Sequence, residues 1–137
     1  MIGNAIRAIL VADATANGVL AGRVHPVRAP QSPTQPYAVY NVVSDDPTYS
    51  LSGHSGLSFA RIQIDAFDDD YADAHDAAEK IRLALVDYTG TAASVGICWI
   101  QPQDVRDDIG THKDGRETGV YRVSRDFLVS FAQAASA

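Results

Sequence analysis

The first candidate for chemistry is the stretch Gly53-His54-Ser55-Gly56-Leu57, which approaches the Gly-x-Ser-x-Gly pattern of a hydrolase nucleophile. In that pattern the serine sits on a tight turn between a strand and a helix. Here Leu57 stands in place of the last glycine, and the residues that follow alternate like a strand. We therefore interpret the stretch as a Ser/Gly loop rather than as a nucleophile.

Two further stretches contain residue types that bind phosphate or metal ions, again at unsuitable spacing. Residues 110–117 have the glycine spacing of a phosphate-binding loop, but Arg116 and Glu117 occupy the positions of its lysine and its hydroxyl residue. A strand pattern follows, where the motif needs a helix. The aspartates within 68–73 lack the alternate spacing, the central glycine and the final glutamate of a helix-loop-helix calcium site. These aspartates are better explained as residues that cap the first turn of a helix.

The remaining candidate ligands and nucleophiles are scattered. The lone cysteine, Cys98, lies in an apolar strand pattern beside Trp99, which favours a buried structural thiol. No two histidines have helical ligand spacing: they are His25, His54, His75 and His112. We expect no catalytic residue, no metal site and no cofactor, and hence a protein that is not an enzyme.

Size and charge narrow the class of protein further. A chain of 137 residues predicts one domain, 1–137, with its own core. The net charge of −6, without any run of Lys and Arg among aromatics, argues against specific nucleic-acid binding. The apolar run at 8–12 ends at Asp13, so it is too short for a signal peptide or a membrane span. We expect no membrane partner and a location in the cytoplasm of the producing cell.

A central strand followed by a helix organises the chain. In the segment 57–67, small and apolar residues alternate with polar ones, which predicts a half-buried strand. The aspartates at 68–70 can cap a helix and neutralise its positive end. Apolar residues recur at three- and four-residue spacing over 72–88, which predicts an amphipathic helix.

The other elements complete the predicted fold. Residues 3–16 form an apolar helical stripe that Asn17-Gly18 would end. Residues 22–26 suggest an edge strand or an extended lead-in, and strands follow at 37–43, 95–101 and 120–131. Successive strands without a helix between them favour antiparallel pairing. We predict an α+β domain with a mostly antiparallel four-stranded sheet and two helices packed on one face.

Two long polar segments, at 45–56 and 104–119, are predicted to be loops. Loops of this length are usually functional or disordered, and apolar side chains on loops often become contacts in an assembly. From both segments we select six candidate interface residues: Tyr49, Leu51, His54, Arg106, Lys113 and Arg116.

Several short segments, in this order and spacing, together resemble the phage tail completion family, the tail terminators of long-tailed phages and related gene-transfer particles. The resemblance covers nearly the whole chain. Its segments are Gly22-Arg23-Val24-His25-Pro26, Pro36-Tyr37-Ala38-Val39-Tyr40, Leu51-Ser52-Gly53, Arg61-Ile62-Gln63-Ile64-Asp65-Ala66-Phe67 with Tyr71 and Ala74, Ile81-Arg82-Leu83-Ala84-Leu85, Glu117-Thr118-Gly119-Val120-Tyr121-Arg122 and Asp126-Phe127.

The resemblance implies a structural virion protein that caps the tail tube as a ring of itself, usually a hexamer. Such a ring ends tube polymerisation and joins the tail to the head connector, or stopper, at the head-proximal end of the virion. It assembles in the host cytoplasm, and DNA may pass through it. The family has no catalytic residues to transfer to this chain.

Other functions stay open from the sequence. A head-completion or connector-adaptor protein, or another tail component, would share the virion location. A small cytoplasmic binding domain would differ in class, and a fixed dimer with a concave apolar pocket would favour it.

Overall fold

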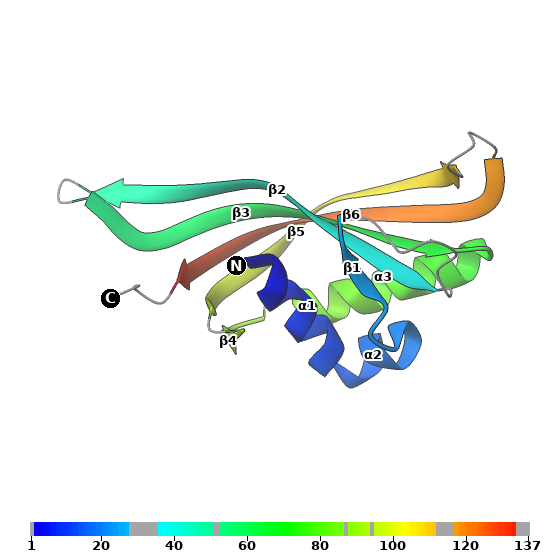
Figure 1. Cartoon of the computed structure of the whole chain (residues 1–137), viewed down its shortest axis with the longest axis horizontal. Coiled ribbons are helices and arrows are strands. Elements are labelled where there is room, and N and C mark those ends of the chain that lie inside the picture. Colours follow the sequence, from blue (N-terminus) through cyan, green and yellow to red (C-terminus); the bar gives the residue numbers. More distant parts are fainter. Residues whose placement is uncertain are drawn as a thin grey trace.

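The computed structural model describes residues 2–27, 36–50, 53–86, 88–93, 95–111 and 117–133. Side chains are described in these ranges except at 45–50, 53–57, 104–111, 117–120 and 133. Within the described residues the chain forms three helices and one six-stranded sheet. The helices lie together on one face of the sheet (Figure 1).

The first predicted helix is two helices, α1 (Ile2–Ala12) and α2 (Ala14–Leu20). The division falls at Asp13, whose carboxylate accepts a hydrogen bond from the backbone N–H of Ala16 at 2.9 Å. This side chain is the N-cap of α2, so the chain bends at Asp13. The predicted stop at Asn17-Gly18 is wrong, because both residues lie inside α2, which ends at Ala21 in the left-handed conformation.

The sheet is larger than the predicted four strands and contains one parallel pair. Its spatial order is β1-β2-β3-β6-β5-β4; β1 is parallel to β2 and the other neighbours are antiparallel. The prediction of an α+β fold with mostly antiparallel pairing is confirmed, whereas the counts of four strands and two helices are wrong. The strands are β1 (Val24–Pro26), β2 (Tyr37–Ser50), β3 (Gly53–Asp68), β4 (Gly90–Ala92), β5 (Val95–Thr111) and β6 (Glu117–Gln133).

The predicted strand-and-helix unit is the centre of the structure. The predicted inward face of β3 is at most 1% exposed, and the small and apolar stripe of α3 (Tyr71–Leu85) is buried against it. The Asp70 carboxylate accepts hydrogen bonds from the backbone N–H groups of Ala72 and Asp73, which confirms the predicted N-cap. Those inward residues of β3 are Ala60, Ile62, Ile64 and Ala66.

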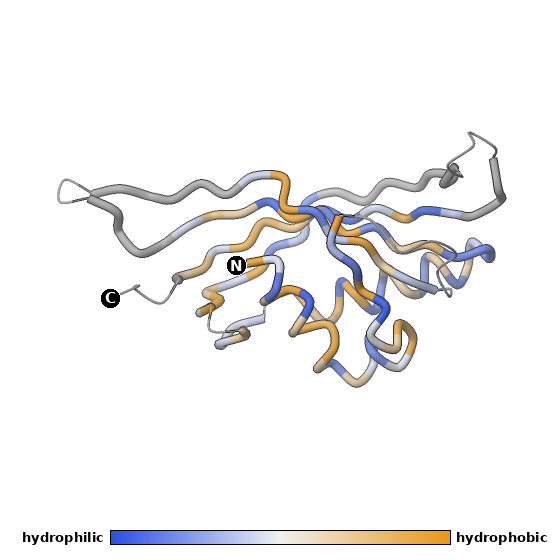
Figure 2. The backbone as a smooth tube through the Cα atoms, in the orientation of Figure 1, coloured by the Kyte–Doolittle hydropathy of each residue, from blue (hydrophilic) through white to orange (hydrophobic). Residues whose placement is uncertain are grey.

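The core lies between the helices and the sheet, where apolar residues of α1, α3 and the strands face one another (Figure 2). Close packing of α1 on β2 depends on a small residue at Gly3. A Cβ atom there would lie 2.9 Å from the Tyr40 ring, closer than side-chain carbons approach in proteins. Gly3 therefore allows α1 to rest directly on the Tyr40 ring.

The two segments that we predicted to be loops are largely strands. Residues 45–50 pair with 53–60 in the β2–β3 hairpin, and 105–111 pair with 117–125 in the β5–β6 hairpin. Period-two apolar alternation is weak in these segments, because outside the core neither face needs to be buried. The loop prediction failed for that reason.

Each hairpin extends past the central part of the sheet. β3 pairs with β6 only from Leu57 to Asp68, so the hairpin ends beyond these residues are two-stranded ribbons. Because β3 and β6 are antiparallel, the two ribbons project from opposite ends of the sheet (Figure 1).

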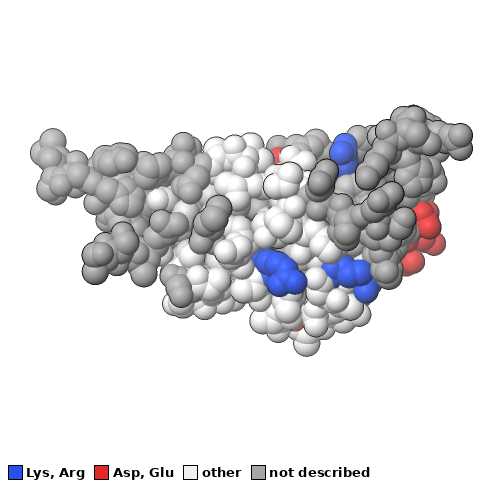
Figure 3. Space-filling model, viewed as in Figure 1, with Lys and Arg blue, Asp and Glu red and all other residues white. Residues whose placement is uncertain are grey.

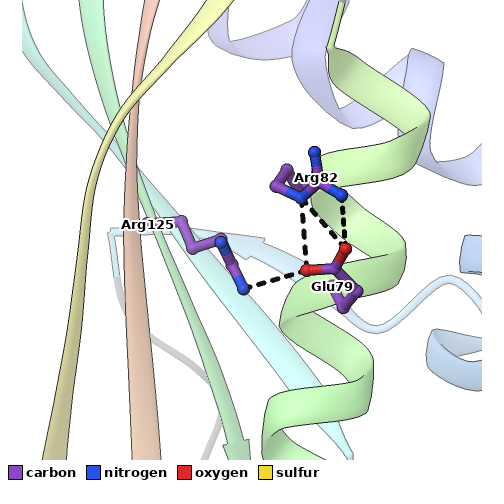
Figure 4. Close-up of polar contacts among 3 residues, drawn as sticks. All are labelled: Glu79, Arg82 and Arg125. Carbon is purple, nitrogen blue, oxygen red and sulfur yellow. Dashed lines mark hydrogen bonds and ion pairs between the residues drawn. The ribbon is translucent and has the colours of Figure 1, made fainter.

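One buried cation interrupts the apolar face of β6. Arg125 is 7% exposed, and its guanidinium donates to Glu79 of α3 at 3.1 Å. Arg82, one turn further along α3, donates to the same carboxylate, so two cations share one anion (Figure 4). This group ties α3 to the centre of the sheet.

The ionisation of Glu79 is expected to make the stability of the fold depend on pH. The hydrogen bond from Arg82 is the largest cause of a lowered pKa at Glu79. Ionised Glu79 therefore stabilises the fold fully above its unfolded pKa of about 4.3, and this contribution is lost as the pH falls through the lower folded pKa. Since the Glu79 side chain is 41% exposed, we expect less than about 1 kcal/mol at neutral pH.

Glu79→Gln measures this contribution directly. Urea unfolding of both proteins should give a difference at pH 7 that begins to shrink near the unfolded pKa of about 4.3 and disappears once the pH is below the lowered folded pKa. A difference that stays constant across this range would show that the effect of the substitution is not the loss of charge.

Candidate functional site

Among the side chains that the structure describes, those that could do chemistry are not brought together. The described part of the chain contains no group of three or more His, Cys, Asp or Glu side chains arranged for a metal ion. The aspartates before α3 serve its start: Asp68 accepts from the backbone N–H of Asp70, and Asp70 caps the helix. Repulsion from neighbouring carboxylates, Asp70 first, raises the pKa of Asp73.

The predicted buried thiol of Cys98 is exposed. The register of β5 shifts between Ile97 and Trp99, which leaves Cys98 as the extra residue of a β-bulge. The shift also interrupts strict alternation along β5: Ile97 and Ile100 are buried, while Trp99 is 36% exposed. A bulge depends on strand pairing, so its position could not be seen in the sequence of β5.

Three of the six candidate interface residues lie in described strands. Tyr49 of β2 and His54 of β3 are directly opposite each other in the hairpin ribbon. Arg106 of β5 pairs with Ser124 of β6, nearer the body of the sheet. The structure thus brings Tyr49 and His54 together but holds Arg106 at the other hairpin. Leu51, Lys113 and Arg116 lie outside the described residues.

The long hairpins also carry open strand edges. β1 covers β2 only at 38–40, and β4 covers β5 only at 95–97. In the described part of the chain, no strand pairs with the outer edges of 41–50 or 98–111. Such edges present backbone N–H and C=O groups to another chain.

The sheet face away from the helices has a polar centre. Asp65 of β3 is 6% exposed and accepts hydrogen bonds from Ser124 of β6 at 2.5 Å and from the Gln63 amide at 3.1 Å. These two donors satisfy the hydrogen-bonding capacity of the buried Asp65 carboxylate. Its bond to Ser124 therefore helps to hold β3 and β6 together. The arrangement offers no free nucleophile or base at Asp65.

Beside this polar centre lies an aromatic pair that sequence reasoning missed. Phe59 of β3 and Trp99 of β5 are both opposite Ser130 of β6, and their ring centroids are 6.1 Å apart. The two rings extend over the small serine, which is only 4% exposed. A tryptophan in a strand pattern was the available signal, but only the pairing shows which face it is on.

A separate concavity lies on the helical side. It is open to the surface, has a volume of about 390 Å³, and is bordered by the C-terminal half of α1, the end of α3 with Tyr88, and β4. Small side chains make most of its walls, with one carboxylate, that of Asp13. Concave sites of this size in proteins can hold small molecules.

Charge is unevenly distributed over the face drawn in Figure 3. Basic side chains lie in the lower middle of this view, and acidic side chains gather at the end where α3 begins. No helix among the described residues is long and apolar enough to cross a membrane. Projecting hairpins with open strand edges are typical of a protein that assembles with other chains.

The comparisons with known proteins agree with this class. The family model described as "Tail completion protein gp17" matches residues 4–128, so the chain belongs to the tail completion family. It is thus a structural assembly protein of a phage-type tail. No curated protein matches the chain in sequence.

Among solved structures, the chain is similar to one in the "Virion of native gene transfer agent (GTA) particle". The TM-score is 0.67 and the sequence identity 16%, over 93% of this chain and 92% of that chain. At this identity the likeness shows a shared fold.

Proposed function

We propose that this chain is a tail terminator: copies of it form a ring, a hexamer in the simplest case, on the finished end of the tail tube. The ring ends tube polymerisation and joins the tail to the head connector at the head-proximal end of the virion. Membership in the tail completion family supports this role. The specific steps are our inference from the shape of the chain.

The observation that carries the proposal is the projection of two ribbons from opposite ends of one sheet (Figure 1). A protein between a tube and a connector needs two contact surfaces that face apart. Isolated two-stranded ribbons are marginally stable in water, and their open edges favour pairing with another chain. We assign one ribbon to the tube side and the other to the connector side, with Tyr49 and His54 on the β2–β3 ribbon.

Electron microscopy of particles assembled without this gene tests the proposal. We expect overlong or ragged tails beside DNA-filled heads to which they are not joined. Supplying the gene in trans should restore the length and the joining of the tails.

Two other results would overturn the proposal. Tails of normal length with leaking or empty heads would assign the chain to head completion or to a connector adaptor. Intact infectious particles would assign it to a binding role outside assembly.

A further inference from the structure

The exposed indole of Trp99 lies on the outer face of the sheet. The Trp99 ring packs against Phe59 on one side, yet the residue is 36% exposed. Leu128 of β6 lies on this same face and is half-buried, so the rings border a small apolar surface. Tryptophan is enriched among the residues that dominate binding energy in interfaces.

The concavity on the helical side has room for an indole and offers an acceptor for its N–H group. Four alanines, Ala8, Ala12, Ala84 and Ala92, leave room for a large flat ring within its volume of about 390 Å³. An indole also needs an acceptor for its N–H group when water is removed. The Asp13 carboxylate lines the same concavity and can accept this hydrogen bond.

Charge supports the same pairing of surfaces. Arg61 is two residues from Phe59 on β3 and lies on the outer face, so the aromatic surface carries a cation. The concavity contributes an anion at Asp13 and no cation among its lining residues. When the two surfaces meet, the positive charge of Arg61 and the negative charge of Asp13 would come together at the rim of an apolar contact.

We propose that Trp99 of one copy inserts into the α1–α3–β4 concavity of the next copy. The inference rests on the proposed ring, and it identifies the surfaces that join neighbouring copies. The two surfaces belong to opposite layers of the fold, the outer sheet face and the helical layer. One patch therefore meets a different patch on the neighbour, which is the type of contact that gives a ring when the rotation between neighbours closes.

Trp99→Ala should weaken self-assembly without unfolding the chain. Sedimentation over a concentration series should show the half-assembly concentration raised by at least about tenfold, the effect expected of an interface anchor. Tyr71→Ala is the matched control, because Tyr71 is an exposed aromatic residue at the other end of the molecule, 43% exposed. Thermal unfolding should confirm that both variants remain folded.

Thiol cross-linking tests the position of the proposed contact independently of the assembly measurement. Cys98 is exposed and adjacent to Trp99, and Ala84 lines the concavity. Ala84→Cys treated with a short bifunctional maleimide should therefore give a ladder of linked chains that disappears in Cys98→Ser. Asp76→Cys, an exposed position on the same helix, should give no ladder.

Three outcomes would overturn the inference. Trp99→Ala chains could assemble at the same concentration as the original chain, assembled chains could fail to cross-link through Ala84→Cys, or the chain could stay monomeric at every concentration. None of these results depends on tail length. If the gene deletion still gave overlong tails, the terminator role would stand and only this contact would be wrong.

Discussion

Replacing Ile62 with aspartate is expected to abolish folding. Ile62 is fully buried under the helices, and its cross-strand neighbours are the apolar residues Val42 and Phe127. An unpaired buried carboxylate costs several kcal/mol, against a total stability of about 5–15 kcal/mol for a domain of this kind. Circular dichroism and sedimentation of the purified chain would measure the loss of the folded state.

Two further variants distinguish the effect of the introduced charge on stability from the effect of lost packing. Ile62→Val should cost only about 0.5–1.5 kcal/mol, because it removes one methyl group. Ile64→Asp should be milder than Ile62→Asp, since Ile64 is directly opposite Arg125, whose guanidinium can pair with the new carboxylate. Equal effects of the two aspartates would contradict the register of β3 and β6.

Replacing Arg125 with glutamate is expected to remove about 3–5 kcal/mol of stability. The substitution breaks the pair with Glu79 and puts a second carboxylate beside it, in a position that is 7% exposed. The two neighbouring carboxylates repel each other, and burial at position 125 deprives the new carboxylate of water. Urea unfolding would measure this difference in the free energy of unfolding. It follows from the shift of the unfolding midpoint when the dependence on urea concentration has the same slope for both proteins.

Arg125→Met is the matched control for this prediction. Methionine keeps much of the length of the side chain and removes the buried charge. Because Glu79 is 41% exposed and keeps Arg82 as its partner, the change should be close to neutral. If Arg125→Met were as unstable as Arg125→Glu, the arginine would act through its own hydrogen bonds rather than through charge balance.

The central scaffold could be predicted because its signals are local. Alternation along β3 and the three- and four-residue spacing along α3 each follow from burying one face of a single element. The Asp70 cap needs only its own backbone neighbours within three residues. Nothing distant had to be known for these features, and the structure confirms them.

The failures share a different cause. Asp13 divides a continuous apolar stripe into two helices, because its cap competes with helix continuation. Short strands such as β4 carry too few residues for a pattern, and they exist through pairing with β5. The hairpin segments at 45–56 and 104–119 alternate weakly, since they project beyond the core that would enforce alternation.

The local pattern thus determined the class of fold, the central β3–α3 unit and the absence of any recognisable catalytic motif. Only the tertiary structure decided which surfaces the chain presents. The bulge at Cys98 turns Trp99 away from the helices, and distant segments of α1, α3 and β4 enclose the concavity. Both depend on pairings between residues far apart in the chain, which no single element encodes.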